Sequence, residues 1–178
     1  MEFEILNELN IDIAINMQRE IFPLENGSQD LKEALDNKCP EHQFLQKYWL
    51  VKIDNKYIGI FGLYAYNHSP KDAWLGWFGV VENERRKGYG RIILNKAKEM
   101  ARDLGFETLR LYTDEDSNDN AVLLYRKLGM LEEVYENLDD VHFEVGKTLI
   151  FSISLSDRQV DLWNDKNLYL NSHEEKNK

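Results

Sequence analysis

The sequence predicts a single α+β domain, in which a mixed, mostly antiparallel sheet of about six to seven strands packs against about four helices. The chain has 178 residues, of which 43% are hydrophobic, and this is enough to bury one sizeable core. Short runs rich in β-branched and aromatic residues stand beside amphipathic helical patterns, with turn signals between them. No internal repeat or long linker divides these segments.

The N-terminal part is predicted to contain a short strand and two helices. Residues 3–6 have strand character, and apolar residues recur at helical spacing over 10–22, with Asn10 as the N-cap. A second helix is predicted over 28–38, where Ser28 stands in the capping position.

Three successive antiparallel strands are predicted next, over 48–53, 57–66 and 73–81. Residues 54–56 (DNK) have the composition of a tight hairpin turn, and residues 67–72 include a Ser-Pro pair typical of a second turn.

A strand, a helix and a strand then form a crossover. The helix after residue 88 has one apolar stripe and ends at Gly105, a residue suited to the left-handed position after a helix. Residues 107–113 alternate like a half-buried strand, which should lie parallel, or nearly so, to its neighbour. A further helix over 118–128 and an antiparallel strand pair over 130–137 and 147–155 complete the expected elements.

The globular domain is expected to comprise residues 1–155. The polar residues 156–178 are expected to form a C-terminal extension, with a short helix around 160–169 and then a frayed tail.

The charge balance argues against two classes of partner. The formal net charge is −10, whereas nucleic-acid binding requires a basic face. No run approaches the roughly 18 consecutive apolar residues of a membrane helix, and the acidic N-terminal segment has no secretory leader. We therefore expect a cytoplasmic protein that binds neither nucleic acid nor a membrane.

Cysteine and histidine usage gives no sign of a disulfide or a metal site. Cys39 is the single cysteine, so no intramolecular disulfide can form; in its polar surroundings it is interpreted as an incidental thiol. The histidines (His42, His68, His142 and His173) have no ligand spacing, so no metal is expected.

The strongest functional signal lies at the turn between an apolar strand and a helix, within residues 74–104. Positive charge gathers there, on Arg85, Arg86, Lys87 and Arg91. Backbone N–H groups at a helix start favour an anion, especially a phosphate, and Gly88 and Gly90 allow a ligand to approach the backbone closely. By itself, such a cluster is more often a solvated face.

Two motifs resemble signatures of the GNAT superfamily of N-acetyltransferases. Arg85, Gly88 and Gly90 form R-x-x-G-x-G, similar to the family's [QR]-x-x-G-x-[GA] pyrophosphate signature. Residues 118–130 resemble the family's N-x-x-A-x-x-[LF]-Y-x-K-x-G-[FM] helix. The resemblance covers roughly residues 3–155, and the element order agrees with a single GNAT-like domain.

The resemblance implies that acetyl-CoA is the cofactor, and it implies a role for particular residues. The backbone at Val80 would pair with the pantetheine arm, Asn118 would hydrogen-bond the cofactor, and Tyr125 would act as general acid near the thioester sulfur. The full set of implied cofactor-binding residues is Phe78, Val80, Arg85, Arg86, Lys87, Gly88, Tyr89, Gly90, Arg91, Asn118 and Tyr125. Taken without the motif, Tyr125 would be a core tyrosine and Asn118 a helix cap.

The acceptor side is less defined by the sequence. Some family members place a glutamate base six residues before the position of Val80, but Trp74 stands there. Two routes for removal of the amine proton are considered: a relay of water molecules, or one of the carboxylates Glu82, Asp114 and Glu115. Several aromatic residues could line an acceptor pocket, although about half of such strand residues should pack in the core: Tyr57, Phe61, Tyr64, Tyr66, Trp74, Trp77 and Phe78.

The predicted activity is transfer of an acetyl group to a primary amine of a small molecule or a protein. The acidic balance weakly favours a cationic acceptor such as a polyamine, an aminoglycoside or a lysine side chain. The alternative is a GNAT-fold protein that binds coenzyme A as a sensor without turnover. Dimers are common in the family, so a homodimer is the prior expectation.

Overall fold

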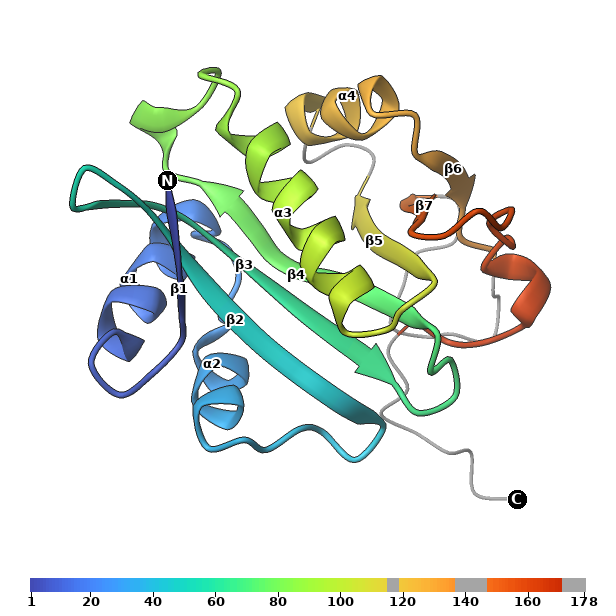
Figure 1. The fold of residues 1–178 in the computed structure, drawn as a ribbon, viewed down its shortest axis with the longest axis horizontal. Coiled ribbons are helices and arrows are strands. Elements are labelled where there is room, and N and C mark those ends of the chain that lie inside the picture. The colour runs from blue at the N-terminus through green and yellow to red at the C-terminus, as the bar shows by residue number, and fades with distance from the viewer. Residues whose placement is uncertain (115–118, 137–146, 171–178) are drawn as a thin grey trace.

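The computed structural model describes residues 1–114, 119–136 and 147–170 (Figure 1). The strands are β1 (Glu2–Ile5), β2 (Gln43–Ile53), β3 (Lys56–Tyr66), β4 (Asp72–Val80), β5 (Thr108–Asp114), β6 (Leu131–Val134) and β7 (Thr148–Ser154). The helices are α1 (Ile11–Ile21), α2 (Ser28–Leu35), α3 (Tyr89–Asp103) and α4 (Asp119–Lys127), with 3-10 turns η1 (Glu82–Glu84) and η2 (Asn164–Lys166).

One mixed sheet organises the fold, with strand order β1-β2-β3-β4-β5-β7-β6. Neighbouring strands are antiparallel except β4 and β5, which run parallel because α3 forms the crossover between them. The predicted fold class, a single α+β domain with a mostly antiparallel sheet, is confirmed.

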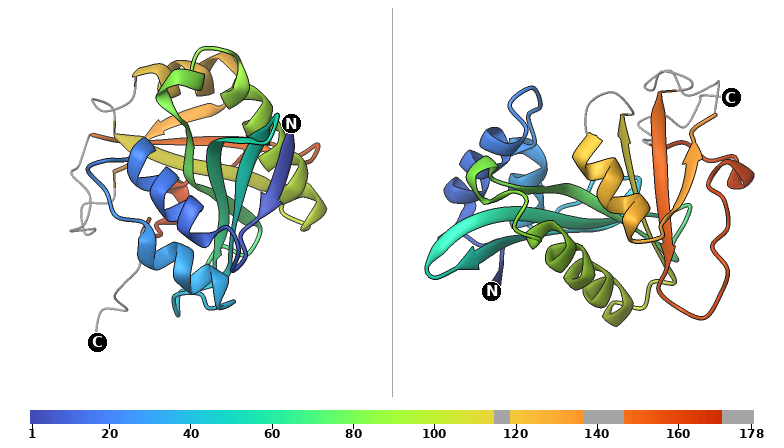
Figure 2. Two further views of the ribbon diagram at one scale, coloured as in Figure 1. Left: turned by 90° about the vertical axis from the view of Figure 1, so that its left-hand side faces the viewer. Right: turned by 90° about the horizontal axis from the view of Figure 1, so that it is seen from above.

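The helices cover the sheet on both faces (Figure 2). The apolar stripe of α3, with Ile93, Leu94 and Ala97, packs with residues of α4 against one face in the main core cluster. On the other face, α1 and α2 bury Ala14, Ile15 and other residues against β2 and β3. The sheet is therefore a layer between two helical layers.

The turn chemistry matches the sequence in detail. Ile53 pairs with Lys56, so the hairpin loop consists of Asp54 and Asn55, which have φ angles of 47° and 65°. Two positive φ angles indicate a type I′ turn, which suits the twist of the flanking strands. Gly105 adopts φ +90° after α3, as predicted.

Of the two predicted N-cap residues, Asn10 is confirmed in position and Ser28 is not. Asn10 occupies the N-cap position of α1, but its side chain hydrogen-bonds Asn7 and Ile5 instead of the helix. The N-cap of α2 is Gly27, and the Ser28 hydroxyl donates to Asn26 Oδ1 at 2.6 Å. Local turns before each helix compete for these short polar side chains.

Several boundaries also differ. β2 begins at Gln43, five residues earlier than predicted, because pairing with β3 continues as far as Tyr66. α2 ends at Leu35, since Asn37 adopts a left-handed φ of 53°. The helix expected around 160–169 is only the single 3-10 turn η2.

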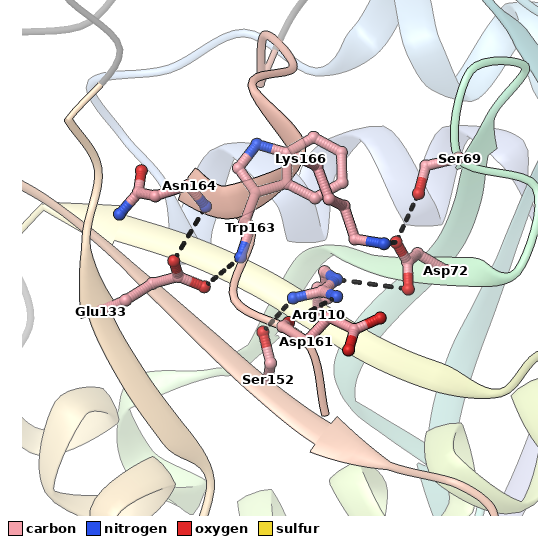
Figure 3. A network of polar contacts seen from close by, with 9 residues as sticks. All are labelled: Ser69, Asp72, Arg110, Glu133, Ser152, Asp161, Trp163, Asn164 and Lys166. Carbon is pink, nitrogen blue, oxygen red and sulfur yellow. Dashed lines mark hydrogen bonds and ion pairs between the residues drawn. The ribbon is translucent and has the colours of Figure 1, made fainter. Parts of the chain in front are cut away.

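Residues 156–170, called here the C-terminal strap, lie against the sheet (Figure 3). Trp163 and Leu170 are fully buried. Both carboxylate oxygens of Glu133 on β6 accept strap backbone N–H groups, from Trp163 at 2.7 Å and from Asn164 at 3.0 Å. Arg110 on β5 donates to the carbonyl of Asp161 at 2.9 Å. Specific anchors therefore hold this polar segment in place, and the expected tail after residue 170 lies outside the described residues.

Arg110 is the buried centre of the same network (Figure 3). Its guanidinium donates to Ser152 at 2.8 Å, forms an ion pair with Asp72 at 3.3 Å and lies over the Trp163 ring. Lys166 of the strap approaches the same Asp72 carboxylate at 3.6 Å. The strap thus supplies part of the environment that a buried charge requires.

In the part of the chain that the structure describes, none of the helices is both long and apolar enough to span a bilayer.

Candidate functional site

The turn from β4 to α3 doubles back on the strand that precedes it. We call residues 82–91 the cationic turn. After η1, Arg85 donates a hydrogen bond from Nε to the carbonyl oxygen of Val80 at 2.8 Å. Arg86 and Gly88 adopt left-handed φ angles of 63° and 85°, and α3 begins at Tyr89. The turn therefore has a defined backbone conformation.

The two glycines of the turn serve different purposes. A Cβ atom at Gly88 would have no neighbour within 4 Å, so its positive φ is what favours glycine there. A Cβ atom at Gly90 would lie 3.2 Å from Leu124 Cδ2 and 3.8 Å from Phe78 Cζ. Gly90 thus allows α4 and β4 to pack close to the start of α3, whereas the space beside Gly88 stays open.

The charges of the turn are only partly neutralised. Arg85, Arg86, Lys87 and Arg91 are all exposed. Lys87 forms an ion pair with Glu84 at 2.8 Å, and Lys56 of the β2–β3 hairpin meets the same carboxylate at 2.8 Å. These two hydrogen-bonded lysines lower the pKa of Glu84.

Two arginines of the turn keep their full charge available. Among the described residues, Arg86 and Arg91 have no ion pair. The start of α3 also has no side-chain cap and no acidic residue in its first turn. Its first N–H groups therefore have no side-chain acceptor and lie beside these arginines in the chain, an arrangement that suits a phosphate.

Next to this turn, one edge of β4 is open. β4 and β5 pair only from Asp72 to Trp74 and from Thr108 to Arg110, and then they diverge (Figure 1). The register with β3 shifts between Ile60 and Gly62, and Trp77 in the bulged stretch of β4 has a φ of 43°. The backbone groups of β4 beyond Trp74 are thus not paired with β5 and can accept an extended ligand as an added strand.

Tyr125 lies on the α4 side of this opening. Its ring centroid is 6.4 Å from that of Phe78 on β4 and 5.1 Å from that of Phe151 on β7. The side chain is 5% exposed, and burial raises its pKa above the usual value for tyrosine. Its hydroxyl has no hydrogen-bond partner among the described residues. The ring is therefore a core residue while the hydroxyl keeps its hydrogen-bonding capacity.

Comparison with known proteins agrees with this geometry. The sequence model of the Acetyltransferase (GNAT) family matches residues 12–130. This chain belongs to the GNAT acetyltransferase family. It is 33% identical over 102 residues to the uncharacterized N-acetyltransferase YdgE of Bacillus subtilis (strain 168). That alignment covers 55% of this chain and 64% of the relative, which is less than two thirds of the relative's length.

Solved GNAT structures share the fold. A putative acetyltransferase of the GNAT family from Desulfovibrio desulfuricans superposes with a TM-score of 0.71 at 14% identity, covering 87% of this chain and 99% of that one. The PaiA N-acetyltransferase of Thermoplasma acidophilum, solved in complex with coenzyme A, gives a TM-score of 0.63 at 16% identity, covering 86% and 99% of the two chains.

The other GNAT positions named from the sequence fall in different places. Asn118 and Glu115 lie outside the described residues. Trp74 is fully buried, in an aromatic cluster with Tyr64, Tyr112 and Trp163 at centroid distances of 6.3, 6.1 and 4.8 Å. An indole cannot serve as a base, and here its position is filled by packing against the strap.

The two described carboxylates considered as bases lie at different ends of the site. Glu82 is exposed on η1 in the cationic turn. Asp114 is the exposed last residue of β5, at the end where β5 has diverged from β4. Of the two, only Asp114 lies on β5, the strand that flanks the open edge.

Sequence reasoning did not single out a group of residues that joins the α1–α2 connection, α2 and β5. Glu25 in the α1–α2 connection and Asp30 on α2 both influence the pKa of Tyr112 on β5, which burial and these carboxylates raise to about 12. Asp30 also accepts a 2.9 Å hydrogen bond from Trp77 Nε1. No local pattern links these residues, since they are distant in the chain.

Proposed function

We propose that this GNAT protein transfers the acetyl group of acetyl-CoA to a primary amine of a small molecule or a protein. The observation that carries the proposal is a juxtaposition: the unpaired edge of β4 joins a cationic helix start at one end and has the Tyr125 ring beside it, 6.4 Å from the ring of Phe78. A carrier with three parts fits these features: its pyrophosphate would lie at the helix start, its extended amide arm along the edge of β4, and its reactive thioester beside Tyr125.

The residues present fit such a cofactor. The open space beside Gly88, the uncapped N–H groups of α3 and the charges of Arg86 and Arg91 would hold the pyrophosphate. The backbone of β4 around Phe78 and Val80 would pair with the pantetheine arm. When bound, the cofactor supplies an activated acetyl carbonyl with a thiolate leaving group.

The proposed chemistry is direct attack. The amine nitrogen forms a bond to the acetyl carbonyl carbon while the carbon–sulfur bond breaks, and a backbone N–H near Val80 stabilises the negative charge that develops on the oxygen. Tyr125 would donate its hydroxyl proton to the leaving thiolate, and the proton lost by the amine would restore the phenol through solvent. Holding both reactants in the opening contributes much of the acceleration.

The amine must also become neutral before it attacks. A primary alkylamine with a pKa of about 10.4 is only about one part in 2,500 neutral at pH 7. Because Trp74 replaces a carboxylate at the strand position used by some relatives, we propose a water-relayed path on the side of Asp114.

Two measurements test this function. Acetyl-CoA should raise the melting temperature of the protein, and thiol release should then follow when amines are supplied. A melting temperature that does not change at millimolar acetyl-CoA would contradict cofactor binding. Binding without thiol release for any amine would instead favour the sensor alternative, which the burial of Trp74 in place of a base mildly supports.

A further inference from the structure

Tyrosine rings lie flat on the sheet on the face that carries α1 and α2. Gly62 on β3 pairs with Gly76 on β4. A Cβ atom at Gly62 would come within 2.3 Å of the Tyr48 ring, and one at Gly76 within 3.2 Å of the Tyr64 ring. The paired glycines therefore leave room for the two rings to lie along the sheet, where they form an aromatic floor.

A third tyrosine extends this floor toward the open edge of β4. Tyr112 on β5 and Tyr64 on β3 both contact the buried Trp74, at 6.1 and 6.3 Å between ring centroids. Both tyrosines keep some exposed surface. Burial raises the pKa of Tyr64 and Tyr112, so both phenols stay protonated and uncharged. The floor is thus apolar, with hydroxyl groups at its margin.

Three carboxylates act electrostatically on these tyrosines. Glu25, Asp30 and Asp114 come from three different segments. Burial and then the charge of Asp114 raise the pKa of Glu25, and the charges of Glu25 and Asp30 act on Tyr112. Among the described residues, Glu25 has no ion pair. Gathering carboxylates in this way is unfavourable unless a cation lies between them.

Independent of these charges, two buried amide oxygens lack donors. Gln46 is 8% exposed; its Nε2 donates to the Tyr48 hydroxyl at 3.2 Å, so its side chain is directed at the tyrosine floor. Gln18 is fully buried, and its Nε2 donates to the backbone carbonyl of Glu25 at 3.3 Å. The Oε1 atoms of Gln18 and Gln46 have no partner in the described parts of the chain. Each of these amides therefore leaves one buried acceptor without a donor, next to Glu25 in one case and next to Tyr48 in the other.

We propose that the acceptor amine carries a second positive charge, that is, that it is a flexible alkyl diamine. The inference rests on the proposed acetyl transfer. The alkyl chain lies on the rings of Tyr64 and Tyr112, the reacting amine faces the open edge of β4, and Glu25 with its neighbouring carboxylates holds the distal ammonium. Aromatic faces and carboxylates both favour a cation over a neutral tail.

A matched set of amines tests this directly. Cadaverine ends in a second ammonium, hexylamine replaces it with a methyl group of similar size, and aminocaproate ends in a carboxylate. We expect kcat/KM for cadaverine to exceed that for hexylamine by at least about tenfold, as one partly screened ion pair allows, with aminocaproate lowest. Equal values for cadaverine and hexylamine would overturn the proposal.

A pair of variants locates the charge. Glu25→Gln should lower the ratio of kcat/KM for cadaverine to kcat/KM for hexylamine by about tenfold. The reason is that the substitution removes one charge from the site without changing the size of the side chain. Glu20→Gln, at an exposed carboxylate on α1, is the matched control and should leave the ratio unchanged. A ratio that is the same in Glu25→Gln and in the wild type would overturn the assignment of the subsite.

Calorimetry separates this inference from the activity. Cadaverine is titrated into the protein saturated with coenzyme A, with no acetyl group present. Binding that Glu25→Gln weakens supports the diamine subsite, even where thiol release with every amine fails and refutes the proposed transfer. If cadaverine at millimolar concentration gives no heat of binding while hexylamine is acetylated, the proposed transferase function stands and the proposed diamine subsite is rejected.

Discussion

Arg85 Nε and the carbonyl oxygen of Val80 are joined by a 2.8 Å hydrogen bond that closes the cationic turn on the last residue of β4. The strand that would pair with the pantetheine arm and the turn that would hold the pyrophosphate are therefore fixed to each other by one side chain. Arg85 has a structural role here besides its charge.

Arg85→Lys should raise the KM for acetyl-CoA by about tenfold while changing kcat less, because lysine keeps the charge and cannot reproduce the Nε–H geometry. Arg19→Lys, at an exposed arginine in the last turn of α1, is the matched control because it lies outside the cationic turn. Steady-state kinetics with varied acetyl-CoA measures both. Equal KM values for the two variants would show that only the charge of Arg85 matters.

Gly88→Ala and Gly105→Ala should each cost about 1 kcal/mol of unfolding free energy, because both sites have left-handed φ angles. Those angles are +85° and +90°, and neither site has a neighbour that a Cβ would meet. Only Gly88→Ala should also weaken acetyl-CoA binding. Urea titration and calorimetry measure the two effects, and unchanged cofactor affinity in Gly88→Ala would place the pyrophosphate elsewhere.

Tyr125→Phe should lower kcat about a hundredfold with little change in acetyl-CoA affinity, because it removes only the proton donated to the leaving thiolate. Tyr57→Phe is a suitable control, since its hydroxyl donates to Glu4 at 2.6 Å near the β1 edge of the sheet. An unchanged kcat in Tyr125→Phe would remove its assignment as the acid.

The pH dependence of kcat/KM should rise through the alkaline range as the amine loses its proton. Burial raises the pKa of Tyr125, so its hydroxyl stays protonated, and it should add no descending limb below about pH 10. Rate profiles of wild type and Tyr125→Phe check this. A fall in the wild-type profile near neutral pH that disappears in the variant would contradict it.

Trp163→Ala should reduce the unfolding free energy by about 3–5 kcal/mol, because it empties a fully buried site beneath the strap. Leu162→Ala, at a side chain that is 37% exposed, should cost less than about 1 kcal/mol. Chemical denaturation of both variants makes the comparison. A small effect of Trp163→Ala would mean that the strap contributes little to the packed domain.

Local signals were sufficient for much of the fold. The turn of Asp54 and Asn55, the positive φ of Gly105 and the strand–helix–strand crossover each depend on residues close together in the chain, and each was predicted correctly. The start of β2 depends instead on pairing with its partner strand β3, and for this reason the observed boundary differs from the predicted one.

The cationic turn was also evident from the amino-acid sequence, since a strand, glycines, positive charges and a helix start are consecutive there. The tertiary structure alone decided that Gly90 is needed for packing against Leu124, that Lys87 shares Glu84 with Lys56, and that Trp163 is buried. It also gathered Glu25, Tyr48 and Tyr112 on one face of the sheet. Such contacts join segments far apart in the chain, so their energies leave no local pattern in the sequence.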